Sequence, residues 1–557
     1  MERECDVLVV GAGAGGMATA VTAARLGLKV TIIEKAPVFG GTTAFSGGVL
    51  WIPGNPRDPG DREAARTYMK AETGNFYDEE AVELYLDEAP KMLDFFERET
   101  AVAFVPTLYP DYHPDAPGGV EVGRSVLAAP FNASALGANL KRLRPPLKTI
   151  TFMGMMFNSS NADIKHFFNA TKSARSFVYV AKRLAAHFVE LARYGRGVNV
   201  TSGNALAARL AKSCFDLGVE IHTSTPALRL IQGPAGVTGA EVATPQGPVT
   251  VTARKGVVLA AGGFAQDLTR IRAAYPHLRQ GGTHLSPVPE DNTGDGITLG
   301  QGAGARFETR LPATSAWIPV SQVPVGGGKV APFPHLIDRY KPGIIAVLAN
   351  GKRFTNESNS YHDVGEAMIA ACAGQAETAC WLIADREALR KYGLGFVKPA
   401  PMPIGRFLRN GYLRTGRTLG DLARACGIDA SAFEATVTRF NAAAERGEDP
   451  EFHRGSTAFN RYLADPEHRP NPCVAPIRQG PFYAVKMVMG DLGTFDGLEC
   501  TPQGQVLDLS GQPIPGLYAV GNDRASVMGG NYPGAGITLG PAMTFGYVTA
   551  RHLAGVA

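Results

Sequence analysis

DVLVVGAGAGGMATAVTAARLGLKVTIIE, residues 6–34, is the stretch that decides the fold. Residues 6–10 form a short, mainly apolar run, of the kind that is buried on both faces of a parallel sheet. A glycine turn follows, residues 16–26 are rich in helix formers, and residues 30–33 return as a second buried strand. The stretch therefore predicts one strand–helix–strand unit of a Rossmann-like α/β fold.

The glycines of this turn have the spacing that a pyrophosphate requires. Gly11 allows the tight turn, Gly13 lets the backbone approach the phosphates, and Gly16 lets helix and strand pack closely. The helix N-terminus supplies free N–H donors to the phosphates. Glu34 ends the second strand about 20 residues later, where a carboxylate can accept hydrogen bonds from a ribose diol. We therefore expect a bound dinucleotide.

Several remote segments favour FAD over NAD as that dinucleotide. A second glycine-rich loop, KAPVFGGTTAFSGG, follows Glu34 directly and brings three hydroxyls to the same end of the sheet. Residues 257–261 form another buried strand that ends in two glycines, and residues 514–523 add a strand with Asn522 and Asp523 at its tip. An extended cofactor that spans a cleft needs such additional contacts. Since only one complete fingerprint is present, a separate nicotinamide site is not expected.

Size and composition set the limits of the interpretation. A chain of 557 residues exceeds the size at which one hydrophobic core stops growing, so two lobes are expected. With 45% hydrophobic residues, 19% charged residues and a net charge of +4, no basic stripe suggests nucleic acid. Seven scattered cysteines without a C-x-x-C pair indicate reduced thiols and no metal site. We expect no transmembrane segment and a cytoplasmic location.

The predicted lobes are interleaved along the chain. Residues 1–280 and 488–557 are expected to form one discontinuous FAD-binding lobe, and residues 281–487 an inserted α+β lobe that carries substrate and catalytic groups. The active site should lie between the two lobes. Residues 104–180 are an excursion rich in aromatic residues and methionine, interpreted as a packed cap on the sheet. The alternative is an apolar substrate channel, or a surface that touches a membrane through loose association.

Four further motifs extend the opening block into a family resemblance. They are GGTTAFSGG at residues 40–48, NTGDG at 292–296, GKRFTNES at 351–358 and NYPGAGITLGPAMTFGY at 531–547. Together these blocks resemble the 3-ketosteroid Δ1-dehydrogenases, within the wider fumarate reductase and succinate dehydrogenase flavoprotein superfamily. The cofactor contacts that we expect, from the glycine turn and from this resemblance, are Gly11, Gly13, Gly15, Gly16, Glu34, Lys35, Gly41, Thr42, Thr43, Ser46, Gly47, Gly48, Ala227, Ala261, Gly262, Asp295, Asn522, Asp523, Gly536 and Leu539.

Two departures from fumarate reductase argue against a dicarboxylate substrate. The arginine that the superfamily places at the end of RFTNESNSY is Tyr361 here, and the arginine expected before the late glycine pair is Val527. Without both guanidiniums, a dicarboxylate in a desolvated cleft would stay uncompensated, at a cost of several kcal/mol. The glycine loops also lack the histidine that tethers FAD covalently in succinate dehydrogenases. We therefore expect noncovalent FAD.

Desaturation of a ketone requires a donor to the carbonyl oxygen and a base for the α proton. Tyr532 and the backbone N–H of Gly536 share one turn, and the resemblance implies that they bind the carbonyl oxygen as an oxyanion hole. The resemblance also implies Tyr361 as the base, supported by Tyr112, with Tyr109 as a competitor for that supporting position. A tyrosine with a satisfied hydroxyl in the core is the ordinary alternative for each.

Other polar residues near these motifs receive plainer interpretations. His113 and His362 are expected to face solvent, with a role in a proton relay as the alternative. Asp295 and Glu357 are expected to hold loops or FAD. Asn204 is expected to cap a helix, with a cofactor contact as the alternative.

The resulting prediction is FAD-dependent α,β-dehydrogenation of a cyclic ketone, foremost 3-oxosteroid 1(2)-desaturation. Because the usual TYAGPG turn of the family reads NYPGAG here, a smaller cyclohexanone-type ring is the alternative. An enone or fumarate-type reductase and a non-enzymatic FAD-binding protein are further alternatives. The expected partners are a hydrophobic ketone and an external electron acceptor, either a quinone or an electron-transfer protein.

Overall fold

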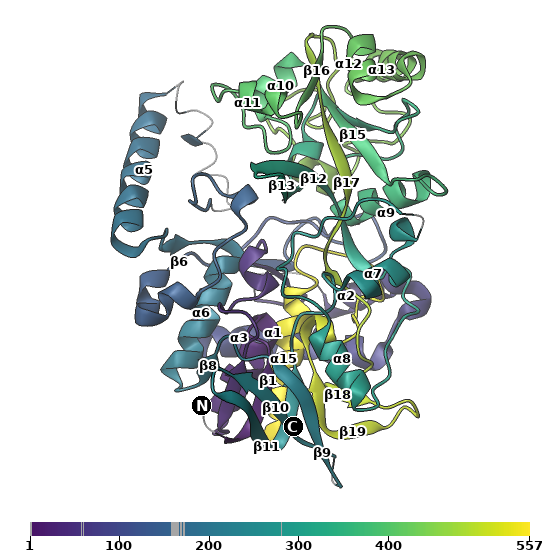
Figure 1. Ribbon diagram of the computed structural model, residues 1–557. Coiled ribbons are helices and arrows are strands. Elements are labelled where there is room, and N and C mark those ends of the chain that lie inside the picture. Colours follow the sequence, from purple (N-terminus) through teal and green to yellow (C-terminus); the bar gives the residue numbers. More distant parts are fainter. Residues whose placement is uncertain are drawn as a thin grey trace.

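The large sheet of the protein is a mixed α/β sheet of eight strands (Figure 1). The computed structural model describes residues 3–56, 58, 61–157, 166–167, 170, 173–234, 236–279 and 281–556. The strands are β1 (Glu4–Val10), β2 (Val30–Ile33), β8 (Glu220–His222), β9 (Ala227–Gly233), β10 (Gly236–Thr244), β11 (Gly247–Leu259), β18 (Gln505–Leu507) and β19 (Pro513–Ala519). Five of them, in the order β19-β11-β1-β2-β8, are parallel, and this confirms the predicted α/β fold.

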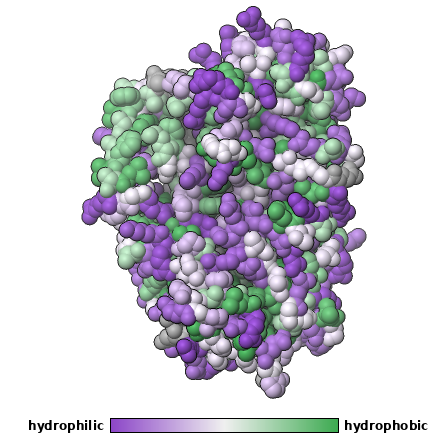
Figure 2. Space-filling view, viewed as in Figure 1, coloured by the Kyte–Doolittle hydropathy of each residue, from purple (hydrophilic) through white to green (hydrophobic). Residues whose placement is uncertain are grey.

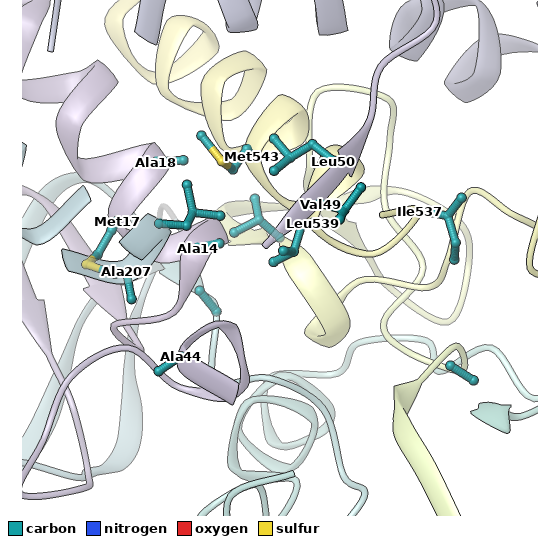
Figure 3. Close-up of a cluster of buried hydrophobic side chains, with 14 of the residues drawn as sticks. Ala14, Met17, Ala18, Ala44, Val49, Leu50, Ala207, Ile537, Leu539 and Met543 are labelled. Carbon is teal, nitrogen blue, oxygen red and sulfur yellow. The ribbon is translucent and has the colours of Figure 1, made fainter. Parts of the chain in front are cut away.

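Helices bury the glycine turn from several sides. The first helix, α1 (Ala14–Arg25), packs against α15 (Leu539–Ala554) and α6 (Ser202–Asp216). Small residues allow the close approach, since a Cβ on Gly546 would lie 2.8 Å from the carbonyl oxygen of Gly15. Figure 3 shows the apolar side chains of α1, α15 and the neighbouring strand gathered in one cluster. Two further helices, α2 (Arg62–Thr73) and α3 (Glu79–Glu99), complete this side.

A second, antiparallel sheet of six strands forms the upper part of the molecule in Figure 1. Its strands are β12 (Ser315–Gly326), β13 (Lys329–Pro334), β14 (Ile344–Val347), β15 (Ala379–Ala384), β16 (Arg414–Gly416) and β17 (Phe482–Thr494). Its helices are α9 (Tyr361–Ala371), α10 (Arg386–Tyr392), α11 (Gly405–Arg409), α12 (Leu419–Cys426), α13 (Ala430–Ala444) and α14 (Ala458–Tyr462). The predicted lobe boundary at residue 487 falls inside β17.

Several short strands and helices lie outside the two large sheets. The strands β3 (Val49–Trp51), β4 (Phe104–Pro106) and β5 (Ser125–Ala128) form a small antiparallel sheet, and β6 (Phe131–Asn132) pairs with β7 (Asn199–Val200). The helices α7 (Leu268–Ala274) and α8 (Asp295–Gly302) follow the end of β11.

A buried ion-pair network stabilises the second sheet below α13. The Arg353 guanidinium contacts Glu357 at 2.7 Å and Asp449 at 2.7 Å, and none of the three side chains is more than 2% exposed. Because both carboxylates are paired with the guanidinium and with backbone donors, burial of these charges is compensated. The prediction that Glu357 holds a loop agrees with this geometry.

The excursion at residues 104–180 divides into two parts. Its first part packs inward, with Phe104, Leu140 and Met156 buried. The following helix, α5 (Ala174–Tyr194), instead exposes apolar side chains, among them Phe177 and Val189. Figure 2 shows the resulting apolar area on the left of the molecule. Residues 158–165, 168–169 and 171–172 of this excursion lie outside the described part of the chain.

No helix among the described residues is long and apolar enough to cross a membrane. For α5, contact with an apolar channel or with a membrane surface stays a prediction. All seven cysteines of the chain are free thiols.

Candidate active site

The N-terminus of α1 fits a pyrophosphate. The first intrahelical hydrogen bond runs from the Met17 N–H to the Gly13 oxygen at 3.0 Å, so the preceding amides of Gly15 and Gly16 have no acceptor within the helix. Gly11 has a φ of +115°, and a Cβ there would overlap the Ala260 carbonyl. A Cβ on Gly16 would overlap the carbonyl oxygen of Gly11. The turn thus requires glycine for close backbone packing and leaves donors for an anion.

The end of β2 presents a buried acidic group beside this turn. The Glu34 carboxylate accepts the Ala12 N–H at 3.0 Å and the Ala36 N–H at 2.9 Å. Burial raises the pKa of Glu34 although these two backbone donors act against it. The geometry fixes a carboxyl group beside the glycine turn, as the recognition of a ribose requires.

The second glycine-rich loop is tied to both neighbouring segments. The Ala14 N–H donates to Thr43 Oγ1 at 3.0 Å, which attaches the loop to the start of α1. Thr42 Oγ1 accepts Asn292 Nδ2 at 2.9 Å, and the same amide donates to the Gly262 oxygen at 3.0 Å. The loop, the NTGDG motif and the end of β11 therefore meet at one place.

Further predicted cofactor residues join the neighbouring segments to one another. Lys35 forms an ion pair with Asp295 at 2.7 Å. The Asp523 carboxylate accepts the N–H groups of Ala261 at 2.5 Å and Gly263 at 2.9 Å, and burial raises its pKa to about 6. Asp523 thus joins the end of β11 to the end of β19. Ala227 begins β9, and a Cβ on Gly41 would lie 3.5 Å from the Gly13 Cα.

Three tyrosines from remote segments form one buried cluster. The Tyr112 hydroxyl donates to the Tyr361 oxygen at 3.1 Å, across 249 residues of sequence. Tyr112 stacks on Tyr532 with ring centroids 5.4 Å apart and planes inclined by 9°. Tyr361 meets Tyr532 edge to face at 5.1 Å. The structure therefore brings together the three predicted catalytic tyrosines.

Backbone contacts determine where these rings lie. Tyr361 is the first residue of α9, whose cap is the Ser360 hydroxyl, an acceptor for the Asp363 N–H at 3.1 Å. The Tyr112 N–H donates to the Pro533 oxygen at 2.9 Å, next to Tyr532 in the turn. Because Tyr532 lies in this turn and the Tyr112 backbone is hydrogen-bonded to it, the backbone fixes the stacking of these two rings.

Tyr109 lies apart from this cluster. Its ring packs on Tyr462 at a centroid distance of 4.6 Å. Of the two competing tyrosines, it is Tyr112 that contacts Tyr361 and Tyr532.

Burial affects the acidities of the clustered phenols. Burial raises the pKa of Tyr532 to about 12, so this hydroxyl stays a proton donor near neutral pH. Burial, followed by the neighbouring phenols, raises the pKa of Tyr361 well above 10. The position of Tyr361 at the positive end of α9 acts in the opposite direction. Once Tyr361 is deprotonated, the hydroxyl of Tyr112 is placed to donate to the phenolate.

The turn after Tyr532 contains Gly536, at a position where the backbone requires glycine. Gly536 has a φ of +97°, and a Cβ there would overlap the backbone of Val49 and Leu50. Its carbonyl accepts the Trp51 N–H at 3.2 Å and the Gly540 N–H at 2.9 Å, which holds the turn against β3 and α15. A cavity of about 30 Å³ lies beside it, lined by residues that include Thr494, Asn522, Ile537, Thr538 and Ala542.

Two sequence interpretations of single residues are corrected by the structure. His362 does not face solvent: it is 2% exposed, and its Nδ1 accepts the Trp317 N–H at 3.1 Å. Asn204 does not cap α6, since the cap residue is Thr201. The buried Asn204 amide instead donates to the Arg144 oxygen at 2.8 Å, because α6 starts two residues earlier than expected.

Sequence reasoning missed the residues that hold the Tyr112 segment. Asp111 accepts the Trp51 indole N–H at 2.8 Å and pairs with Arg124 at 2.6 Å, with both charged side chains 1% exposed. His113 is not simply solvent-facing either, because it contacts two carboxylates from different helices, Glu72 and Asp363. The only sequence signal for these roles is that Asp111 and His113 flank Tyr112.

Comparison with known proteins places this geometry in context. Residues 6–539 match the family model described as "FAD binding domain". The chain is 44% identical to a 4-oxocyclohex-2-ene-1-carboxylate 5-dehydrogenase of Sinomonas cyclohexanicum, covering 99% of this chain and 94% of that protein. It is 37% identical to a 3-oxosteroid 1-dehydrogenase of Mycobacterium tuberculosis, covering 99% and 98%.

A solved structure gives the same picture. The crystal structure of 3-ketosteroid Δ1-dehydrogenase from Sterolibacterium denitrificans, in complex with 1,4-androstadiene-3,17-dione, superposes with a TM-score of 0.91. The two chains are 36% identical, and each is covered completely. The resemblance stated from the sequence motifs is confirmed.

Proposed function

Because the chain belongs to the FAD binding domain family and is an FAD-dependent oxidoreductase acting on CH–CH groups, we propose that its substrate is a monocyclic, cyclohexanone-type ketone, desaturated between the α and β carbons. The cluster of Tyr112, Tyr361 and Tyr532 carries this proposal. The relative that acts on a 4-oxocyclohexene carboxylate is more similar to the chain than the steroid-specific relatives are. The similarity therefore favours the small ring, which the sequence motifs had left as the alternative.

Two donors would bind the ketone oxygen. The Tyr532 hydroxyl, which burial keeps protonated, and the N–H of Gly536 lie in one turn whose position is fixed by β3. Negative charge builds up on this oxygen as the α proton leaves. Preorganised donors stabilise that charge more strongly than the neutral ketone, so they accelerate proton removal.

Tyr361 would take the α proton onto its phenolate oxygen. Its backbone is at the first position of α9, where the helix N-terminus favours the charged form, and the Tyr112 hydroxyl is placed to donate to the phenolate once it has formed. The edge-to-face contact of Tyr361 with Tyr532 supports this assignment, because a base and a carbonyl donor must lie close together. We propose Tyr112 as the group that supports the base.

When bound, FAD supplies the acceptor for the β hydride at its N5 atom. In this chain the glycine turn, Glu34 and the second glycine-rich loop fit the cofactor, because donors and close-packed glycines face one edge of the sheet. We propose the cofactor contacts that the sequence predicted, with the lobe of residues 1–280 and 488–557 holding FAD and the lobe of residues 281–487 providing Tyr361.

The test compares substrates on the purified FAD-loaded protein with an artificial electron acceptor. Cyclohexanone, 4-oxocyclohexanecarboxylate and a 3-oxo-4-ene steroid are compared by kcat/KM, and the product of each is identified by its new double bond. The proposal predicts the higher kcat/KM for a monocyclic ketone. A steroid that is turned over faster than both monocyclic ketones would replace the proposal with the second candidate, 3-oxosteroid 1(2)-desaturation, which the superposed steroid-bound structure favours.

A further inference from the structure

His113 forms a bridge between the two parts of the molecule that carry the site. Its Nδ1 contacts Glu72 Oε2 of α2 at 2.8 Å, and its Nε2 contacts Asp363 Oδ2 of α9 at 3.1 Å. The helix α2 packs on α3 beside the FAD-binding sheet, whereas α9 packs on β12 of the second sheet. The imidazole ring of His113 therefore connects α2 with α9.

The two carboxylates that contact this ring favour its charged form. Burial acts against the charge, but the hydrogen bonds and charges of Asp363 and Glu72 prevail and raise the pKa of His113 to about 10. The third neighbour is the neutral Tyr68 hydroxyl of α2, which accepts the His113 backbone N–H at 3.2 Å. On the α9 side, Asp363 also interacts with His362 and Tyr340. The ring is thus an imidazolium at neutral pH.

Both His113 and Asp363 are close in sequence to a tyrosine of the cluster. His113 directly follows Tyr112, and Asp363 follows Tyr361 by two residues within the first turn of α9. The hydroxyls of Tyr112 and Tyr361 touch at 3.1 Å. The same two segments are therefore joined twice, once by the phenols and once by the ion pair.

We propose that His113 is a positioning residue for the reaction, which holds the first turn of α9 against Tyr112 and offsets the charge of Asp363, two residues from Tyr361 in that same turn. This inference rests on the proposed role of Tyr361 as base. A nearby carboxylate opposes formation of a phenolate, because like charges disfavour ionisation. The imidazolium cancels that carboxylate, so Tyr361 can lose its proton at a lower pH.

The experiment measures the rate of flavin reduction by a monocyclic ketone as a function of pH, in the FAD-loaded full-length protein. The variants are His113→Gln, Asp363→Asn and the double variant His113→Gln/Asp363→Asn. With His113→Gln, the rise of the rate with pH should move about 1 unit to higher pH, and the rate at neutral pH should fall about tenfold. Asp363→Asn alone should move the profile to lower pH.

The double variant separates charge from shape. It removes both partners of the pair, so the proposal predicts that its pH profile returns toward that of the wild type. A purely structural bridge predicts instead that the double variant is at least as impaired as either single variant. The proposal is overturned by an unchanged profile in His113→Gln, or by a double variant shifted as far as that single variant.

Two controls keep the outcome interpretable. His468→Gln removes a histidine whose ring bonds only the Val474 carbonyl, at 2.9 Å, among the described contacts, and should leave the profile unchanged. The flavin absorbance and thermal midpoint of each variant verify that it is folded. Tyr361→Phe tests the proposed function separately, since an active variant would show that Tyr361 is not the base. If Tyr361→Phe is inactive and the pH profile of His113→Gln is unshifted, only the proposed role of His113 is refuted.

Discussion

Removal of the Tyr532 hydroxyl tests the carbonyl pocket with little disturbance of packing. The ring is 5% exposed and is held by its stacking on Tyr112 at 5.4 Å and its edge contact with Tyr361 at 5.1 Å. Tyr532→Phe keeps both ring contacts, so the free energy of unfolding should change by less than about 1.5 kcal/mol. Loss of one oxyanion donor should lower the rate of flavin reduction about 10²- to 10³-fold, which corresponds to about 2.7–4 kcal/mol.

The assay is single-turnover reduction of the flavin by ketone, followed by its absorbance. Because the donor stabilises charge that develops only as the proton leaves, the loss should appear in the limiting rate and not in the apparent affinity for ketone. Tyr109→Phe is the matched control, since that half-buried ring packs on Tyr462 and not on the three clustered tyrosines. A loss below about tenfold for Tyr532→Phe, or an equal loss for Tyr109→Phe, would refute the assignment.

Three further perturbations test the cradle and the ion pairs. Gly16→Ala places a methyl group against a backbone carbonyl of the glycine turn, so it should lower the free energy of unfolding by about 1–3 kcal/mol. It should also weaken the retention of FAD during gel filtration. Gly302→Ala, which has no atom within 4 Å of its Cβ, should change neither quantity. Arg353→Met should cost about 3–5 kcal/mol in urea unfolding because it removes the buried guanidinium that pairs with both Glu357 and Asp449, although Glu357 keeps Arg454 at 3.3 Å; Arg424→Met at an exposed pair should cost under about 1 kcal/mol. The folded-state pKa of His113 is raised from 6.5 to about 10, so its stabilisation is complete below pH 6.5 and disappears as the pH rises through 10. Since the side chain is 39% exposed, the excess stability over His113→Gln should be about 1–2 kcal/mol after screening; a difference that does not vary with pH would contradict this ion pair.

The local part of the fold could be predicted because its signals are local. Strand, glycine turn, helix and strand follow each other within residues 6–34, and the nearest atoms to a Cβ on Gly11 or Gly16 belong to the same unit or to the end of β11. The requirement for glycine at Gly11 and Gly16 is therefore readable from spacing alone. The second sheet carries no comparable motif, and apart from the β12–β13 hairpin its strands are paired antiparallel across long connections.

The tyrosine cluster could not be derived from sequence spacing. Tyr112 and Tyr361 are 249 residues apart, and only the family resemblance brought them together before the structure did. His362 shows the opposite failure, since it adjoins Tyr361 in sequence but turns inward to the Trp317 N–H. Which way a helical side chain points depends on the strand that packs against it, here β12, and this contact has no local signature.

The most direct test of the account is anaerobic titration of the FAD-loaded protein with a monocyclic ketone, beside its Tyr361→Phe variant. The account predicts that cyclohexanone or 4-oxocyclohexanecarboxylate bleaches the flavin of the wild type, with formation of the α,β-unsaturated ketone. It also predicts that the flavin of the variant stays oxidised on the same time scale. A flavin that no cyclic ketone reduces, or a variant that is reduced as fast as the wild type, would contradict the account.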